Sequence, residues 1–205
     1  MHDLLIITSS KYFPLLVYFL FLQIYFIAEY ANTYTYQRTS VTSRSFLIYG
    51  NRGNWEFWVM QVLTVWEYLS VRFMMRYIPW LSLRWLRGPG LVVSVAGLVV
   101  RHLAMKTCGA SFSHYLAHTK QPHHRLVTHG VYRHVRHPSY FGFWLFSIGI
   151  QLWLSNYINL VIISYILYRF FDIRIGHEER LLLQFYGAEY QQYQQHTYRF
   201  LPFIN

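Results

Sequence analysis

The range Ser139–Tyr168 is an apolar stretch of 30 residues without a charge or a histidine. As one helix it would be about 45 Å long at about 1.5 Å per residue, which exceeds the roughly 30 Å core of a bilayer. The polar pair Ser155-Asn156 near its middle indicates a turn. We therefore predict a transmembrane hairpin with spans at 139–154 and 157–171. A hairpin places the polar segments that flank it on the same side of the membrane.

Three further apolar segments complete the predicted membrane region, at 12–30, 56–75 and 90–105. Hydrophobic residues make up 54% of the chain and charged residues 13%, and that charged share is about half the share of a typical soluble domain. The single cysteine, Cys108, excludes a disulfide-stapled secreted domain. We therefore predict an all-α integral membrane protein with about five transmembrane helices.

Basic residues dominate the middle of the chain, and the whole chain has a formal charge of +10. No acidic residue occurs from Tyr68 to Phe171, whereas this stretch holds 11 lysines and arginines. In a soluble protein such a stretch would suggest nucleic-acid binding. Here the arginines flank apolar runs, so we expect contact with anionic lipid headgroups and no binding of nucleic acid.

The same charges predict the orientation in the membrane. The segment 106–138 is rich in lysine and arginine, and the positive-inside tendency places it in the cytosol. The segment 172–205 follows it to that side because only the hairpin separates the two. The connection Arg76–Arg87 would then lie on the opposite side with three arginines, against the same tendency.

Seven histidines lie between residues 114 and 137, and a metal site is the first interpretation to test. His114 and His118 are four residues apart, so a helix would place them on one face, and imidazole suits iron or zinc. Membrane di-iron desaturases and hydroxylases use several histidine boxes, of which only the HxxxH spacing occurs here. We therefore predict no metal, and a di-iron membrane oxidoreductase stays as an alternative.

The most specific motif is HRLVTHGVYRHVRHPSY, which ends at the hairpin. Pro138 keeps His137 out of helical conformation and can begin the apolar helix that follows. Unpaired N–H groups at the start of that helix favour a carboxylate or another acceptor group. By itself this stretch fits either a binding site or a simple turn at the membrane entry.

A second motif, RIGHEERLLLQFYGAEYQQY, follows the hairpin. Arg174 and Glu178 are four residues apart and share a helix face. On an exposed helix they would form only a weak ion pair. The apolar residues from Leu181 to Tyr186 predict an amphipathic helix packed on the membrane domain. Since Arg174 and Glu178 lie just beyond a span, the hairpin can bring them opposite His137–Tyr140.

Together these motifs resemble the isoprenylcysteine carboxyl methyltransferase family. The shared pattern is H-x-LV-x-x-G-x-Y-x-x-x-RHPSY-x-G, a hydrophobic hairpin, and then R-x-x-x-EE-x-x-L, YG-x-EY-x-x-Y and LPFI. It runs from about Gly109 to Ile204 and is nearest the eukaryotic members that act on prenylated CaaX proteins. No glycine-rich GxGxxG loop of a Rossmann methyltransferase occurs in the sequence.

The resemblance implies a division into two regions. Residues 1–105 are expected to form N-terminal transmembrane helices, and 106–205 a cytosol-facing catalytic region. That region comprises a cofactor loop at 106–138, the transmembrane hairpin at 139–171, and a C-terminal amphipathic helix and tail at 172–205.

The resemblance also implies an activity. The chain is expected to be a protein-S-isoprenylcysteine O-methyltransferase that esterifies the C-terminal prenylcysteine carboxylate of CaaX-type proteins. S-adenosyl-L-methionine would donate the methyl group and leave as S-adenosyl-L-homocysteine.

Carried over position by position, the family's site residues fall on this chain as follows. Cofactor contacts are expected at His124, Arg125, Leu126, Val127, Tyr132, His137, Pro138, Ser139, Tyr140 and Glu178. Arg174 is expected to bind the substrate carboxylate, with Glu178 orienting Arg174. The family often has a glutamine where this chain has Ala117, so one polar cofactor contact is either lost or supplied by His118.

We expect the protein to be a monomer in the endoplasmic reticulum membrane, with prenylated CaaX proteins and membrane lipids as partners. A prenyl chain gains roughly 0.8 kcal/mol per buried CH₂ in lipid, so the substrate should approach sideways between helices and the cofactor from the cytosol. Two alternatives stay open besides the di-iron enzyme: an NADPH-dependent enzyme related to sterol reductases, and a non-catalytic membrane scaffold.

Overall fold

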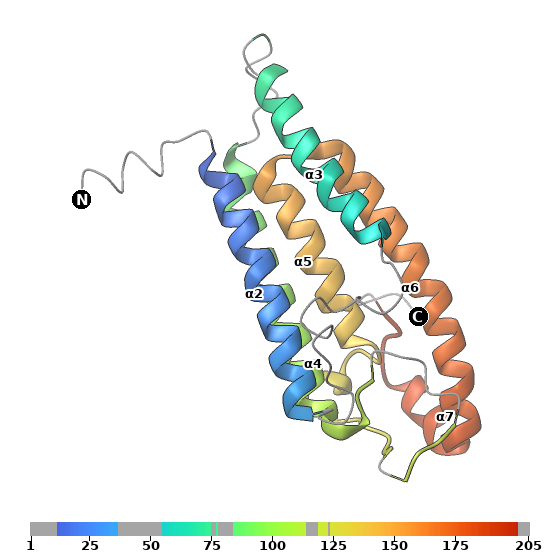
Figure 1. Ribbon diagram of the computed structural model, residues 1–205. Coiled ribbons are helices and arrows are strands. Elements are labelled where there is room, and N and C mark those ends of the chain that lie inside the picture. The colour runs from blue at the N-terminus through green and yellow to red at the C-terminus, as the bar shows by residue number, and fades with distance from the viewer. Residues whose placement is uncertain are drawn as a thin grey trace.

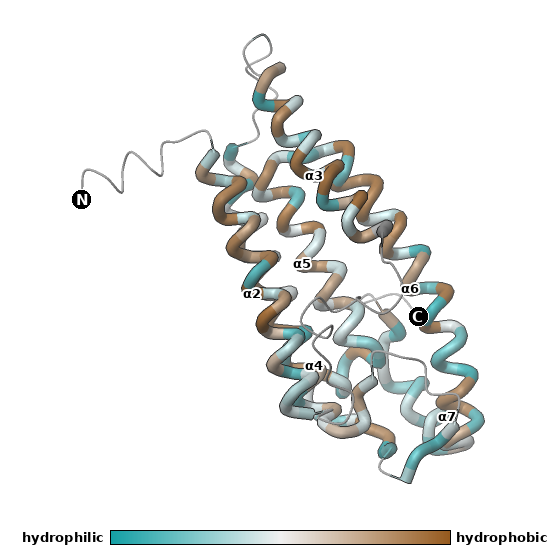
Figure 2. Tube along the Cα trace, viewed as in Figure 1, coloured by the Kyte–Doolittle hydropathy of each residue, from teal (hydrophilic) through white to brown (hydrophobic). Residues whose placement is uncertain are grey.

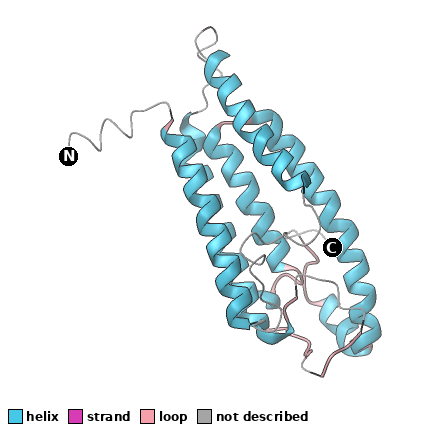
Figure 3. Cartoon of the chain, in the orientation of Figure 1, coloured by secondary structure: helices cyan, strands magenta, loops and turns pink. Residues whose placement is uncertain are grey.

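The structure of the protein is a computed structural model that describes residues 12–36, 55–74, 77, 84–113, 119–122 and 124–200. The α-helices in these ranges are α2 (Phe13–Tyr36), α3 (Trp55–Met74), α4 (Arg87–Cys108), α5 (Pro138–Leu154), α6 (Tyr157–Tyr186) and α7 (Ala188–Gln195). Short 3₁₀ helices accompany them: η4 (Arg84–Leu86), η5 (Gly109–Ser111) and η6 (Gly130–Arg133). Within the described ranges the extended pairing is limited to one bridge between Val135 and Tyr198, so the fold is all-α (Figure 3).

The long helices form an elongated bundle in which α5 and α6 make the predicted hairpin (Figure 1). The turn between them lies at one end of the bundle with the starts of α2 and α4 and the end of α3; we call this the turn end. The start of α5, the ends of α4 and α6, and α7 lie at the other end, the α7 end. Polar residues gather at the α7 end, whereas the helices elsewhere are largely apolar (Figure 2).

All five predicted spans fall on helices, and the helix that carries the last span continues well beyond it. α6 continues without a break to Tyr186, so the segment predicted as a separate amphipathic helix from residue 172 is the second half of the same helix. Residues 169–180 contain no proline and a single glycine, so nothing in the sequence interrupts the backbone hydrogen bonds.

Two helical segments of the described chain are long and apolar enough to cross a membrane, namely Phe13–Tyr36 and Arg84–Ser111. α5 has only 17 residues, and the apolar part of α6 leads directly into a charged part. The helical fold is therefore confirmed for the described residues, while the number of five membrane crossings stays a prediction.

Glycines allow α4 and α5 to pack with their backbones in contact. A Cβ atom at Gly97 of α4 would lie 2.6 Å from the carbonyl oxygen of Gly142, and one at Gly142 would lie 2.7 Å from the backbone nitrogen of Arg101. Gly149 and Gly90 face each other in the same way about two turns further along. Small residues at such positions let membrane helices approach closely. This contact holds the start of α5 against the end of α4.

The turn between α5 and α6 is fixed by polar groups buried inside the bundle. Ser155 adopts a left-handed conformation with φ of 61°, and Asn156 precedes the first residue of α6. Glu67 of α3 accepts hydrogen bonds from the backbone N–H groups of Ile158 and Asn159, at 2.8 Å each. A carboxylate on a neighbouring helix thereby satisfies donors that the first turn of α6 would otherwise leave unpaired.

The close contact of α4 and α5 predicts a specific sensitivity. Gly97→Ala should lower the free energy of unfolding by about 1–3 kcal/mol, because the new methyl group would overlap backbone atoms of α5. Thermal unfolding in detergent, followed by circular dichroism, measures the effect. Gly88→Ala is the matched control, since no heavy atom lies within 4 Å of the position its Cβ would take. Equal melting temperatures for the two variants would contradict the packing described.

Candidate functional site

The start of α5 is shaped as its sequence predicts. His137 precedes the helix with φ of −121° and ψ of 58°, outside the helical region, and Pro138 occupies the first turn. His137 and Ser139 are both buried. Upstream, Gly130 has φ of +60°, a conformation that glycine adopts without strain, and begins η6. These turns direct Tyr132 and the first residues of α5 toward the same space.

That space is a pocket of about 150 Å³ at the α7 end of the bundle. Its walls come from the end of α4 and η5, the loop that follows residue 124, the start of α5, and the second half of α6. All ten residues predicted to contact a cofactor line it: His124, Arg125, Leu126, Val127, Tyr132, His137, Pro138, Ser139, Tyr140 and Glu178. The hairpin thus brings two motifs that are far apart in sequence to one cavity.

Arg174 lies beside this pocket and is linked to it through Tyr140. The Arg174 Nε donates a hydrogen bond to the Tyr140 hydroxyl at 2.8 Å, and that hydroxyl donates to Glu178 Oε2, also at 2.8 Å. The guanidinium carbon lies 5.6 Å from the centre of the Tyr140 ring. The contact predicted between Arg174 and Glu178 on one helix face is therefore relayed by a phenol from the facing helix.

His137 lies between two adjacent carboxylates of α6. Its Nδ1 is 3.9 Å from Glu178 Oε2, and its Nε2 is 3.4 Å from Glu179 Oε1. The imidazole stacks on the Tyr140 ring with an angle of 8° between the planes. Stacking on one side and a carboxylate at each nitrogen leave the ring a single orientation, with one nitrogen toward the pocket residue Glu178.

Comparisons with known proteins point to one family. The chain matches the isoprenylcysteine carboxyl methyltransferase (ICMT) family over residues 90–184. The protein-S-isoprenylcysteine O-methyltransferase of Xenopus laevis is 34% identical over 201 residues, which cover 98% of this chain and 68% of that protein. The solved structure of the eukaryotic intramembrane Ras methyltransferase ICMT matches with a TM-score of 0.85 and 31% identity, over 95% of this chain and 68% of that one. The chain belongs to the ICMT family.

Other relatives match over a shorter range. The probable protein-S-isoprenylcysteine O-methyltransferase of Oryza sativa subsp. indica is 45% identical over 115 residues, which cover 56% of this chain and 60% of that protein. The chain thus spans only about 60% of the length of this plant relative. The membrane fold of the ICMT family, predicted from the motifs, is confirmed for this chain by the structural match.

The sequence motifs did not single out the most connected residue near the pocket, Glu179. This carboxylate accepts from Arg136 Nε at 2.8 Å and from the Tyr190 hydroxyl at 3.3 Å, and lies near His137. Arg199 from the C-terminal segment lies 3.5 Å away. Because Glu179 directly follows Glu178 on α6, the two side chains project in different directions. Glu178 lines the pocket, whereas Glu179 binds the residues that lie behind the pocket wall. The paired glutamates in the motif were the available signal.

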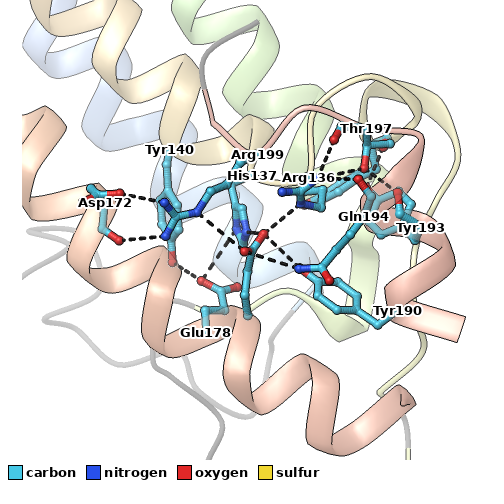
Figure 4. A network of polar contacts seen from close by, with 12 residues as sticks. Arg136, His137, Tyr140, Asp172, Glu178, Tyr190, Tyr193, Gln194, Thr197 and Arg199 are labelled. Carbon is cyan, nitrogen blue, oxygen red and sulfur yellow. Dashed lines mark hydrogen bonds and ion pairs between the residues drawn. The ribbon is translucent and has the colours of Figure 1, made fainter. Parts of the chain in front are cut away.

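Arg136 also fastens the C-terminal segment to the site. Its Nη1 donates to the carbonyl oxygens of Gln194 and Thr197. The backbone N–H of Arg136 donates to the carbonyl of Tyr198 at 2.8 Å, next to the isolated bridge. Arg199 pairs with Asp172 of α6 at 2.7 Å. The segment after α7 is therefore part of the framework behind His137, as Figure 4 shows.

A buried ion pair supports the start of α5, which forms part of the pocket wall, and the sequence motifs did not predict it. Arg101 of α4 pairs with Glu29 of α2, and both side chains are less than 10% exposed. Arg101 Nη1 also donates to the hydroxyl of Ser139 at 3.1 Å and to its carbonyl at 3.2 Å. Arg101 lies within the stretch from Tyr68 to Phe171 that contains no acidic residue. Its acidic partner is 72 residues away, a pairing that sequence spacing cannot reveal.

Several predicted positions lie outside the described residues: His114, Ala117, His118 and His123. The proposed role of His118 in place of the family's glutamine therefore stays a prediction. Among the described residues, no three histidine, cysteine or acidic side chains are grouped to hold a metal ion.

The cations around Glu179 predict an acid-dependent loss of stability. Burial acts to raise the pKa of Glu179, but the hydrogen bonds and charges of His137 and Arg136 outweigh it and lower the pKa from 4.5 to about 2. The charged carboxylate therefore stabilises the folded state above pH 4.5, and this contribution disappears as the pH falls from 4.5 toward 2. It amounts to roughly 3 kcal/mol at about 1.4 kcal/mol per pKa unit.

Thermal unfolding of wild type and Glu179→Gln as a function of pH measures this contribution. The variant should be less stable at pH 7, and the difference should shrink below pH 4.5. Glu189→Gln, at an exposed position on α7, is the control and should follow the wild-type profile. A difference between wild type and Glu179→Gln that stays constant from pH 7 to pH 3 would contradict the role of the charge.

Proposed function

We propose that this protein is an S-adenosyl-L-methionine-dependent methyltransferase that esterifies the C-terminal carboxylate of prenylated cysteine. The observation that carries the proposal is the junction at Tyr140. Its hydroxyl binds Arg174 on one side and the pocket residue Glu178 on the other. A group suited to bind a carboxylate and the pocket therefore meet at one side chain.

Arg174 is suited to hold the carboxylate of the substrate. A guanidinium binds a carboxylate through two parallel hydrogen bonds and stays charged at all physiological pH values. The Tyr140 hydroxyl engages Nε and its ring lies near the guanidinium, so the side chain is oriented before substrate arrives. Such orientation lowers the barrier by fixing the reacting atoms in line.

The pocket residues fit S-adenosyl-L-methionine in chemical character. Glu178 offers a carboxylate, with a side chain 32% exposed, to a positively charged centre. His124 and Arg125 offer donors to a carboxylate, and Leu126, Val127 and the Tyr132 ring offer apolar surface to a nucleobase. When bound, this cofactor supplies a methyl group already activated on a sulfonium sulfur. No side chain is then required to transfer a proton, because a C-terminal carboxylate is ionised near neutral pH.

We infer further that the protein lies in the endoplasmic reticulum membrane with its α7 end on the cytosolic side. The basic residues of the loop between α4 and α5 favour that side, and a polar cofactor would reach the pocket directly from water. The prenyl group of a CaaX-type protein would remain in the lipid and approach between helices.

Arg174→Ala separates the two binding functions. The variant should lose at least 100-fold in the rate of methyl transfer to a farnesylcysteine substrate, because the carboxylate is no longer held, a loss in the range of a charged hydrogen bond. Its affinity for S-adenosyl-L-homocysteine, measured by isothermal titration, should stay within about threefold of wild type. The control is Arg169→Ala on the same helix, whose side chain is 54% exposed. Loss of binding and transfer together would contradict the proposed role and indicate a structural one.

Titration of the wild-type protein with S-adenosyl-L-homocysteine tests the function itself. We expect saturable 1:1 binding, and weakened binding for Glu178→Gln, whose carboxylate lines the pocket. Binding of NADPH in place of the nucleoside, or iron that copurifies in stoichiometric amount, would replace the proposal with one of the oxidoreductase alternatives.

A further inference from the structure

Three arginines gather at the turn end of the bundle, opposite the pocket. Arg72 lies in the last turn of α3, Arg84 begins η4, and Arg87 begins α4. Arg84 and Arg87 lie on neighbouring turns because η4 leads directly into α4, and the end of α3, which carries Arg72, lies at the same end of the bundle (Figure 1). Like charges gathered at one end of a bundle repel each other unless an anion lies between them.

No acidic side chain balances this cluster in the part of the chain that the structure describes. The ion pairs of the described residues involve other arginines and histidines. The sequence explains why, since no acidic residue occurs from Tyr68 to Phe171. Glu67, the acid next to this stretch, accepts from two backbone N–H groups of α6. Within the described ranges the cluster therefore carries uncompensated positive charge.

Arg87 has two buried hydrogen-bond donors without an acceptor in the described part of the chain. Its Nε and Nη2 atoms are buried and form no hydrogen bond within the described structure. A charged donor that is buried without an acceptor is strongly destabilising. A side chain at the surface of a bundle could avoid this cost by turning into solvent. Arg87 instead keeps these two donors inside the bundle, where an acceptor from outside the chain would satisfy them.

The start of α4 adds to the positive potential around Arg87. Leu86, the residue before the helix, provides no side-chain cap, and the first turn contains no acidic residue. The positive end of the helix dipole is therefore left uncapped by any side chain. Gly88 in the same turn has no heavy atom within 4 Å of where a Cβ would lie, so there is room beside the backbone.

Exposed aromatic side chains lie close in sequence to these arginines and indicate the environment of this end of the bundle. Phe73, Tyr77 and Trp85 are 62%, 74% and 71% exposed. Aromatic residues concentrate at the boundary between hydrocarbon and headgroups. Arginines at the same level meet the phosphates of lipids rather than free ions in bulk water.

We propose that Arg72, Arg84 and Arg87 bind the phosphate of an anionic phospholipid at the turn end. The guanidinium of Arg87 reaches the phosphate from inside the bundle, and Arg72 and Arg84 flank it. This site also accounts for two of the three arginines in the connection Arg76–Arg87, on the side where the positive-inside tendency predicts few. The proposal is independent of the methyltransferase activity, because the pocket lies at the other end.

Thermal unfolding of the full chain in detergent tests the site. Dioleoylphosphatidylglycerol should raise the melting temperature of the wild type by roughly 3–6 °C at about ten times its dissociation constant. Arg87→Gln and the exposed Arg84→Gln should each lose most of this shift. Without added lipid, Arg87→Gln should melt at or above the wild-type temperature, because a buried unpaired charge has been removed.

Matched controls decide the outcome. Arg180→Gln removes the same charge from an exposed position of α6 near the α7 end and should keep the full shift. Dioleoylglycerol, with the same chains and no phosphate, should give no shift. An equal shift in Arg87→Gln and wild type, or an equal shift with dioleoylglycerol, would overturn the site. The full shift with inorganic phosphate alone, at the same concentration, would overturn the assignment to a lipid.

Discussion

The unbroken course of α6 is the constraint on which the rest of this structure depends. One helix of 30 residues carries both the returning arm of the hairpin and the polar face that completes the pocket. Its first turn is fixed by Glu67 at the turn end, and Glu179 is held by Arg136 at the α7 end. Since a helix is stiff over this length, the positions of Arg174 and Glu178 relative to the start of α5 are fixed. A break at residue 172 would have left their position to a loop.

Two neighbouring carboxylates have different roles at the α7 end. Glu178 faces the pocket and receives the Tyr140 hydroxyl, while Glu179 binds the cations and hydroxyls behind His137. The imidazole touches both, so the pocket wall and its support are connected through one ring. The C-terminal segment belongs to the same framework through Arg136 and Arg199. The site is thus built from the last hundred residues and braced by Arg101 from α4.

Much of this could be predicted from the sequence because the signals were local. The length of the apolar stretch and its Ser155-Asn156 pair indicated the hairpin, and two motifs with a strong family resemblance identified ten residues that all line the pocket. What escaped prediction depends on contacts between distant segments. Arg101 pairs with Glu29 across 72 positions, and Tyr140 relays a contact that helical spacing alone assigned to Arg174 and Glu178 directly. Helix continuity through residue 172 was missed because the change from apolar to charged composition resembled a boundary.

The carboxylate that caps α6 from α3 has a mechanical consequence. If α3 and α6 moved apart, Glu67 would lose two N–H donors in a region poor in water, and both partners would be left desolvated. Separation of α3 and α6 at the turn end is therefore unfavourable in free energy. Opening of the bundle toward the lipid should therefore cost less where helices contact each other through apolar side chains alone.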